Sequence, residues 1–229
     1  MSELDRILSS ISPFKWALVA SFMVIILGLS VNIYTAMTGF YPKADIGVES
    51  EYATVFKVDQ RVFPIKVDST EGEVAVPIQG KINIIVPQYV RCPDICHYET
   101  LMMKGLMAEL AKRGELDRVV FVTVEVDPWR GTLEEARAYI EESLEGFGLD
   151  PQWIWVGGDV EKLNTLYKQF GLIVQRDKET GLIVHTAGFY IVDEYGRLMY
   201  YVRVEDKGWE RPDAVVQVLL KVLDEVLKS

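Results

Sequence analysis

Two cysteines and a histidine of this 229-residue chain lie within one short segment, as Cys92, Cys96 and His97. These are the only cysteines, and the chain has only one other histidine. The apolar run at 82–86 predicts a buried strand before the segment, and 98–113 predicts a helix after it. A strand that ends in two cysteines and continues into a helix places thiols at a helix N-terminus, where the dipole and the unpaired N–H groups favour thiolate. If the segment is helical, the two sulfurs occupy positions i and i+4 on one face.

Such a pair of thiols can close a disulfide across three residues or hold a soft metal jointly. Thiolates select Cu(I), zinc or iron–sulfur clusters. A structural zinc site usually takes four ligands, whereas Cu(I) needs only one more ligand from elsewhere in the chain. A plain stabilising disulfide or two buried thiols is the alternative, although structural disulfides usually close longer loops than this one. Pro93 between the cysteines fits a first helical turn.

The order of predicted elements is that of an α/β domain with a thioredoxin-like fold, a central sheet flanked by helices. A capping box at Thr132–Glu135 predicts the start of one helix, and Pro212 the start of the last. The cysteines follow the first central strand, where that fold keeps its chemistry. Strands are expected at 52–58, 61–67, 73–76, 82–86, 118–126, 153–156, 188–193 and 198–204, and helices at 98–113, 132–145, 159–170 and 212–227.

The second histidine, His185, stands just before the last predicted hairpin. A lone histidine is more often structural than a ligand, but in a thioredoxin-like fold the loop before this hairpin faces the cysteine loop. His185 is therefore placed to approach Cys92 and Cys96, and a neutral imidazole with two thiolates makes a three-coordinate Cu(I) site. His97 directly follows Cys96 and is expected on a different helix face, in solvent or behind the ligands.

Other residues near the cysteines have simpler interpretations. Three methionines, Met102, Met103 and Met107, could supply thioethers to copper, but their spacing predicts the buried stripe of a helix. Asp127, at the end of a neighbouring strand, could support the site or make an ordinary Asp-Pro turn.

The N-terminal region predicts a single membrane anchor. No charged residue occurs between Trp16 and Pro42, and the apolar stretch from Trp16 to Met37 is long enough to cross a bilayer. A cleaved signal peptide is the competing interpretation; the stretch is longer than a typical signal core and lacks a good cleavage site. Arg6 and Lys15 favour a cytoplasmic N-terminus. We expect a cytoplasmic segment at 1–15, a transmembrane helix at 16–38, a tether at 39–50 and an extracytoplasmic thioredoxin-like domain at 51–229.

The chain carries a formal net charge of −10. An acidic surface argues against nucleic acid and anionic lipid as partners, and solubility alone accounts for it.

Three segments carry a resemblance to a known family. Residues 89–97 are Tyr-Val-Arg-Cys-Pro-Asp-Ile-Cys-His, residues 126–130 are Val-Asp-Pro-Trp-Arg, and residues 185–196 begin His-Thr-Ala-Gly-Phe-Tyr-Ile. Together they resemble the motifs of the Sco/SenC family, membrane-anchored copper proteins of cytochrome oxidase assembly, over roughly residues 74–228. The resemblance implies a thioredoxin-like fold that binds copper through Cys92, Cys96 and His185.

The chain departs from the family pattern at three places. His97 replaces the usual proline after the second cysteine, Val90 replaces a threonine, and Pro87-Gln88 stands where an aromatic–glycine pair is common.

Two functions follow as hypotheses. The first is a copper metallochaperone, not a turnover enzyme, that hands Cu(I) or Cu(II) to a subunit of a terminal cytochrome c oxidase. The second is a membrane-anchored thiol–disulfide oxidoreductase, in which Cys92 and Cys96 are the redox-active pair that reduces cysteines of a partner protein. One dithiol could serve both, because oxidation to the disulfide abolishes the metal site. His185 discriminates, since only the copper site requires it.

Overall fold

The computed structural model describes residues 21, 23, 50–177 and 179–228, and the chain divides into two compact units, Met1–Phe40 and Tyr41–Ser229. The expected anchor at 16–38 and tether at 39–50 lie outside the described residues, apart from Ser21, Met23 and Ser50. Among the described residues, no helix is both long and apolar enough to span a bilayer.

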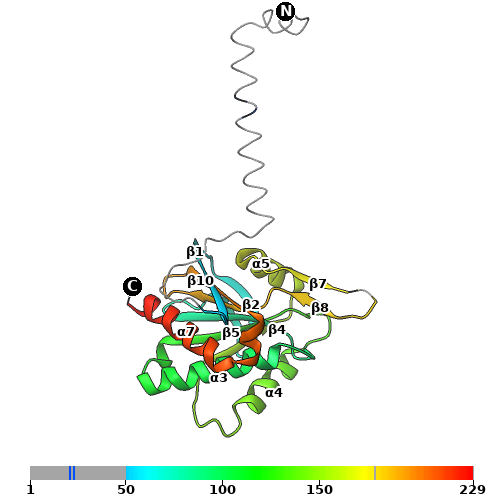
Figure 1. Cartoon of the computed structure of the whole chain (residues 1–229). Coiled ribbons are helices and arrows are strands. Elements are labelled where there is room, and N and C mark those ends of the chain that lie inside the picture. Colours follow the sequence, from blue (N-terminus) through cyan, green and yellow to red (C-terminus); the bar gives the residue numbers. More distant parts are fainter. Residues whose placement is uncertain (1–20, 22, 24–49, 178, 229) are drawn as a thin grey trace, which may run out of the picture. The chain divides into compact units, whose positions relative to one another are not determined.

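The second unit is built on an eight-stranded mixed sheet with strand order β1-β10-β9-β4-β5-β6-β2-β3 (Figure 1). Its centre is parallel, because β4 pairs with β5 and β5 with β6 in the same direction. The outer strands are antiparallel to their neighbours. The strands are β1 (Ala53–Arg61), β2 (Ile65–Ser69), β3 (Gly72–Val76), β4 (Ile82–Gln88), β5 (Val119–Glu125), β6 (Trp153–Gly157), β9 (Phe189–Val192) and β10 (Arg197–Val204).

The central strands β4 and β5 are buried at every position. Continuous burial is expected of parallel strands covered on both faces, and their runs of valine and isoleucine provide it. The register aligns Gln88 with Glu125, so the two strands end together at one edge of the sheet. That edge carries the cysteine loop.

Helices cover both faces of the sheet and divide the core into two clusters. On one face, α3 (Cys96–Arg113) and α7 (Pro212–Leu227) pack together over the sheet, with α4 (Leu133–Leu144) beside them (Figure 1). On the other face, α5 (Val160–Phe170) contributes its apolar side to the second cluster. The short helices η1 (Leu116–Arg118) and α6 (Asp206–Glu210) complete this unit.

Most helices and strands expected from the sequence are confirmed. Two of the signals that predicted where a helix begins are also confirmed. The capping box is formed, because Glu135 N donates to Thr132 Oγ1 at 3.2 Å and Thr132 N donates to Glu135 Oε2 at 3.1 Å. Helix α7 begins at Pro212. The three methionines of α3 lie in the core, fully buried, as their spacing predicted: Met102, Met103 and Met107.

Two expectations about element boundaries are wrong. Helix α3 begins at Cys96, so Cys92 and Pro93 lie in the turn before it and the cysteines do not share a helix face. The expected strand at 61–67 is interrupted, because Arg61 ends β1 and β2 starts only after Pro64, which cannot donate to a ladder.

The stretch before the last hairpin is not a plain loop. It contains a small two-stranded sheet, β7 (Val174–Arg176) and β8 (Ile183–His185), with Val174 opposite His185 (Figure 1). Between these strands, the Asp177 carboxylate accepts from Thr180 N at 2.7 Å. The sequence did not predict this hairpin or α6, and the hairpin is the element that carries His185.

Candidate metal centre

The cysteine loop runs from the end of β4 to the start of α3. Cys92 N donates to Tyr89 O at 3.1 Å, which closes the turn after the strand. Both cysteines are free thiols; Cys92 is half-buried, while Cys96, the first residue of α3, is buried. The expectation of a thiol at the helix N-terminus is therefore confirmed for Cys96.

The two thiols are electrostatically unequal. A hydrogen bond with Cys96 lowers the pKa of Cys92 to about 6, helped by the backbone N–H groups of Asp94 and Cys96 and by the Tyr89 hydroxyl. The same contact with Cys92, followed by burial and the charge of Glu99, raises the pKa of Cys96. At neutral pH the pair is thus a Cys92 thiolate that accepts a hydrogen bond from a protonated Cys96.

His185 presents its imidazole to the cysteine loop in a defined orientation. Its Nδ1 donates to Thr186 O at 3.0 Å, because a carbonyl oxygen can only accept. The proton on Nδ1 leaves the lone pair on Nε2, the tautomer that metal-binding histidines usually adopt. Burial lowers the pKa of His185, so the ring is neutral at physiological pH. The ring meets Tyr89 edge to face, with 5.9 Å between centroids.

Cys92 and His185 line one cavity of about 300 Å³, between the cysteine loop and β8. Cys96 does not line this cavity but is in contact with Cys92. Among residues 50–177 and 179–228, no three histidine, cysteine or acidic side chains already converge closely enough to hold a metal ion. The donor set of two sulfurs and one imidazole nitrogen fits copper chemically. Binding of one ion by all three therefore requires the three side chains to come closer together. The other lining residues are Tyr89, Pro93, Asp94, Ile95, Leu182, Ile183 and Val184.

The turn after β5 supports the hairpin that carries His185. Asp127 is almost fully buried and forms an ion pair with Arg130, and the Arg176 guanidinium of β7 lies 5.8 Å from the centre of the Trp129 ring. Arg130 is also close enough to Tyr89 for its charge to act on the tyrosine hydroxyl. The Asp-Pro-Trp-Arg turn therefore lies between the cysteine loop and the histidine hairpin.

Comparison with known proteins identifies the family. The SCO1/SenC family model matches residues 67–223, which is well over half of the chain. The chain belongs to the SCO1/SenC family. The thioredoxin-like α/β fold expected from the sequence is confirmed by its solved relatives.

The individual Sco relatives are distant in sequence. A putative copper-binding protein of Stutzerimonas stutzeri is 28% identical over 151 residues, covering 64% of this chain and 68% of that protein. The mitochondrial SCO1 homolog 1 of Arabidopsis thaliana is 23% identical over 133 residues, which span 56% of this chain but only 38% of that protein. The solution structure of apo Sco1 from Thermus thermophilus is 26% identical with a TM-score of 0.56, covering 71% of this chain and 92% of that one. The copper-bound structure of yeast Sco1, at 18% identity and a TM-score of 0.54, covers 72% and 89% and supports the fold.

His97, the most conspicuous departure from the Sco pattern, lies away from this cavity. Its side chain is exposed at the start of α3, and its ring lies 3.9 Å from that of Tyr98. It is not among the residues that line the cavity with Cys92 and His185. Of the two positions expected for His97, in solvent or behind the ligands, the structure shows the first.

Two buried polar residues of the site were not predicted to contribute. Gln88 is fully buried and donates from Nε2 to Cys96 O at 2.9 Å, although the sequence marked it only as a departure from the family. Glu99 is fully buried on α3 and accepts from Gly188 N at 3.0 Å through Oε1. Burial raises the pKa of Glu99 to about 8. The available signal was spacing, because Glu99 lies three and four positions before Met102 and Met103 on the apolar stripe.

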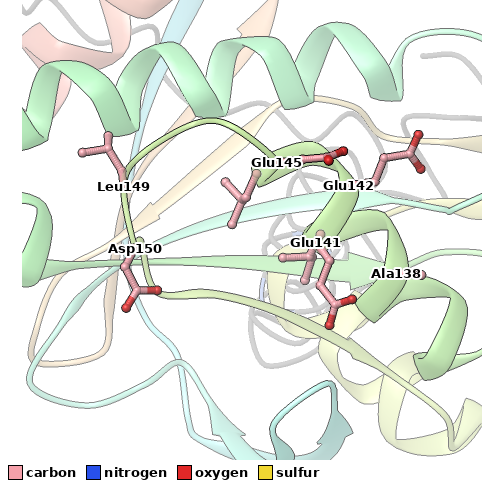
Figure 2. Close-up of a pocket in the computed structure, with 8 residues that line it drawn as sticks. Ala138, Glu141, Glu142, Glu145, Leu149 and Asp150 are labelled. Carbon is pink, nitrogen blue, oxygen red and sulfur yellow. The ribbon is translucent and has the colours of Figure 1, made fainter.

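A larger hollow of about 550 Å³ lies elsewhere, at the C-terminal end of α4 and the loop that follows (Figure 2). Its lining contains four carboxylates, those of Glu141, Glu142, Glu145 and Asp150, and Figure 2 shows them spread around the hollow. It contains no thiol or imidazole. The chemistry of the chain therefore belongs to the smaller cavity at the cysteine loop.

Proposed function

We propose that this Sco protein is a copper metallochaperone that binds copper through Cys92, Cys96 and His185 and delivers it to the copper centre of a terminal cytochrome c oxidase. The observation that carries the proposal is the shared cavity, which Cys92 and His185 line together, with Cys96 in hydrogen-bond contact with Cys92. Family membership supports it, since relatives are described as copper-binding and as structures with copper bound. The copper is cargo, and the partner is the oxidase subunit that receives it.

Each proposed ligand has a role set by its surroundings. Cys92 is already a thiolate near neutral pH and offers the first sulfur. Cys96 must lose its proton when the metal arrives, so copper uptake releases a proton and weakens as the pH falls. The neutral imidazole of His185 adds a nitrogen, which stabilises Cu(II) more than Cu(I) because the harder ion favours nitrogen.

Copper stoichiometry of the full chain tests the proposal. The protein, purified in mild detergent because of its apolar 16–37 stretch, is reduced, loaded with copper and desalted. We expect one copper per chain, and none in Cys92→Ser, in Cys96→Ser or in the oxidised wild type, because serine cannot replace a soft ligand. Tight, stoichiometric copper in either serine variant contradicts the proposed site.

Thiol–disulfide exchange is the second candidate, and the inequality of the two thiols favours it. The Cys92 thiolate would attack a partner's disulfide and release one partner thiolate, leaving a mixed disulfide. Deprotonated Cys96 would then attack Cys92 Sγ, releasing the second partner thiol and leaving a Cys92–Cys96 disulfide. The partner gains the two electrons that the chain loses. A related structure is described as showing a disulfide switch in BsSco. His185→Ala should leave this exchange intact while it weakens Cu(II) binding.

We also propose that the chain is anchored in the cell membrane by residues 16–38, with the cysteine domain at 51–229 outside the cytoplasm. The length of the uncharged stretch and the Arg6 and Lys15 flank support this orientation. Membrane-impermeant thiol reagents applied to intact, reduced cells should label Cys92. Labelling only after lysis would show the opposite topology, with the cysteine domain in the cytoplasm.

A further inference from the structure

One buried carboxyl connects the two halves of the site. Glu99 lies on α3 one turn after Cys96 and is fully buried. Its Oε1 accepts from Gly188 N at 3.0 Å, and Gly188 lies three residues after His185. Its Oε2 has no hydrogen-bond partner among the described residues. Burying a carboxyl costs free energy unless its interactions compensate for the lost water. A glutamate is therefore a more costly residue at this core position than an apolar side chain would be.

The segment between β8 and β9 is fixed at several points. The Tyr201 hydroxyl donates to Ala187 O at 2.7 Å. Gly188 has a φ of +119°, and a Cβ there would lie 2.4 Å from Val202 O, so the backbone presses directly against β10. Thr186 N donates to Ile173 O at 3.0 Å, which joins the segment to the start of β7.

These contacts connect the cysteine helix to the imidazole in series. Glu99 binds the amide of Gly188, the backbone leads back to Thr186, and the Thr186 carbonyl accepts from His185 Nδ1 at 3.0 Å. The position of Thr186 O sets the rotation of the imidazole and hence the direction of Nε2. The side chain of Glu99 thus reaches from the helix of one proposed ligand to the backbone that orients another.

We propose that Glu99 is a positioning residue that holds the His185 segment against the cysteine helix and so sets the distance between the imidazole and the two sulfurs. For its effect on copper the inference rests on the proposed function, whereas the positioning itself is a property of the metal-free protein. Outer contacts of this kind typically change metal affinity by about 10- to 100-fold when they are lost.

Three variants of the full chain distinguish the effect of the Glu99 hydrogen bond from the effects of its burial and charge. Glu99→Gln keeps an accepting oxygen at the same reach. Glu99→Met keeps the length and removes the oxygen, and Glu99→Asp keeps the carboxyl but withdraws it from Gly188. Thermal unfolding of each variant reports whether the fold survives.

The first measurement needs no copper. With only two histidines in the chain, ring-labelled protein gives one set of NMR signals for His185 and one for His97, which serves as the internal control. We expect Glu99→Met to shift the His185 signals and to speed exchange of the Gly188 amide by about tenfold or more, since one hydrogen bond is lost. The His97 signals should not move, and Glu99→Gln should resemble the wild type. A folded Glu99→Met variant with unmoved His185 signals overturns the proposal; if that variant does not fold, Glu99→Asp decides by the same criterion.

The second measurement is Cu(II) affinity. We expect a loss of about 10- to 100-fold in Glu99→Met and near-wild-type affinity in Glu99→Gln. If the wild type binds no copper, the proposed function fails, and the His185 signals still decide the positioning role. If the wild type binds copper and folded Glu99→Met binds it equally tightly, the proposed function stands and Glu99 has no part in it.

Discussion

Tyr89 and His185 meet edge to face, with ring centroids 5.9 Å apart and ring planes at 85°. The hydroxyl of the same tyrosine hydrogen-bonds to Cys92 and helps to lower the pKa of that thiol. One buried aromatic residue therefore contacts both donors that line the cavity. Its own pKa is raised by burial and by the neighbouring thiols, so it remains a protonated donor at physiological pH.

Removing this hydroxyl should make Cys92 less acidic. Tyr89→Phe keeps the ring against His185 but takes away one hydrogen bond to the thiolate. We expect alkylation of Cys92 at pH 6 to slow about two- to threefold, because the thiolate fraction falls. The rate with iodoacetamide, followed by mass spectrometry, checks this. As a control, Tyr195→Phe removes an exposed hydroxyl outside the cavity and should change nothing. An unchanged rate in Tyr89→Phe would show that the contact does not act on Cys92.

The two cysteines should differ sharply in their reaction with alkylating reagents. With a pKa of about 6, Cys92 is mostly thiolate at pH 7, and its alkylation rate should fall roughly tenfold per pH unit well below pH 6. In Cys92→Ser, the remaining Cys96 is buried and should react slowly, even at alkaline pH. In Cys96→Ala, the midpoint for Cys92 should rise, because alanine cannot donate the hydrogen bond that Cys96 gives to the thiolate. Equal rates for both thiols in the reduced wild type would refute the asymmetry.

Stability should decline from mildly acidic to neutral pH because of a buried glutamate. Burial raises the pKa of Glu125 from 4.5 to about 7, although Trp155 Nε1 and Asp127 N donate to its carboxylate. Well below pH 4.5 the Glu125 carboxyl is protonated in both the folded and the unfolded protein. As the pH rises towards 7, the unfolded chain releases its proton first, so up to about 3 kcal/mol of stability is lost by pH 8.

Urea unfolding of the 41–229 unit between pH 4.5 and 8 measures this slope. Whatever its effect on absolute stability, Glu125→Gln should make the slope shallower without abolishing it, because burial also raises the pKa of Glu99, to about 8, and Glu99 contributes a slope of the same sign. Glu141→Gln, at an exposed position of α4, should leave the slope as in the wild type. A slope as steep in Glu125→Gln as in the wild type would assign the whole effect to other groups.

The close approach at Gly188 should make it intolerant of any side chain. Gly188→Ala places a Cβ 2.4 Å from Val202 O, whereas Gly72→Ala, also at positive φ, meets nothing within 4 Å. Both variants bear backbone strain of about 1–2 kcal/mol, and Gly188→Ala should lose about 1–3 kcal/mol more from overpacking. Urea unfolding gives both values. Equal losses would mean that the segment after His185 can shift at little cost.

The sequence predicted the strands and helices around this site better than their boundaries and contacts. An apolar run identified β4, and Pro212 marked the start of α7, because these signals are local. The start of α3 was placed two residues late, and a helical turn was expected at Pro93, because proline suits both a first helical turn and the loop before it. Whether the chain turns helical at Cys92 or at Cys96 depends on tertiary contacts such as the bond from Gln88 to Cys96 O.

The histidine hairpin and the buried acids could not be predicted in the same way. Strands β7 and β8 have three residues each, and the exposed residue of β8 is the apolar Val184, so they leave no periodic pattern to detect. A glutamate on a helix normally faces solvent. Its spacing from Met102 and Met103 places Glu99 on the buried stripe, but no local pattern indicates that its partner is Gly188. The placement of the hairpin at the cysteine loop and the bond between Glu99 and Gly188 each bring together residues about ninety positions apart.

X-ray absorption at the copper edge tests most directly whether Cys92, Cys96 and His185 hold the metal together. For the wild-type full chain loaded with Cu(II), we predict two sulfur ligands and at least one imidazole nitrogen. His185→Ala should lose the imidazole signature and bind Cu(II) much more weakly, while His97→Ala, the matched control, should keep both. A copper site that retains its imidazole in His185→Ala and loses it in His97→Ala would contradict this assignment.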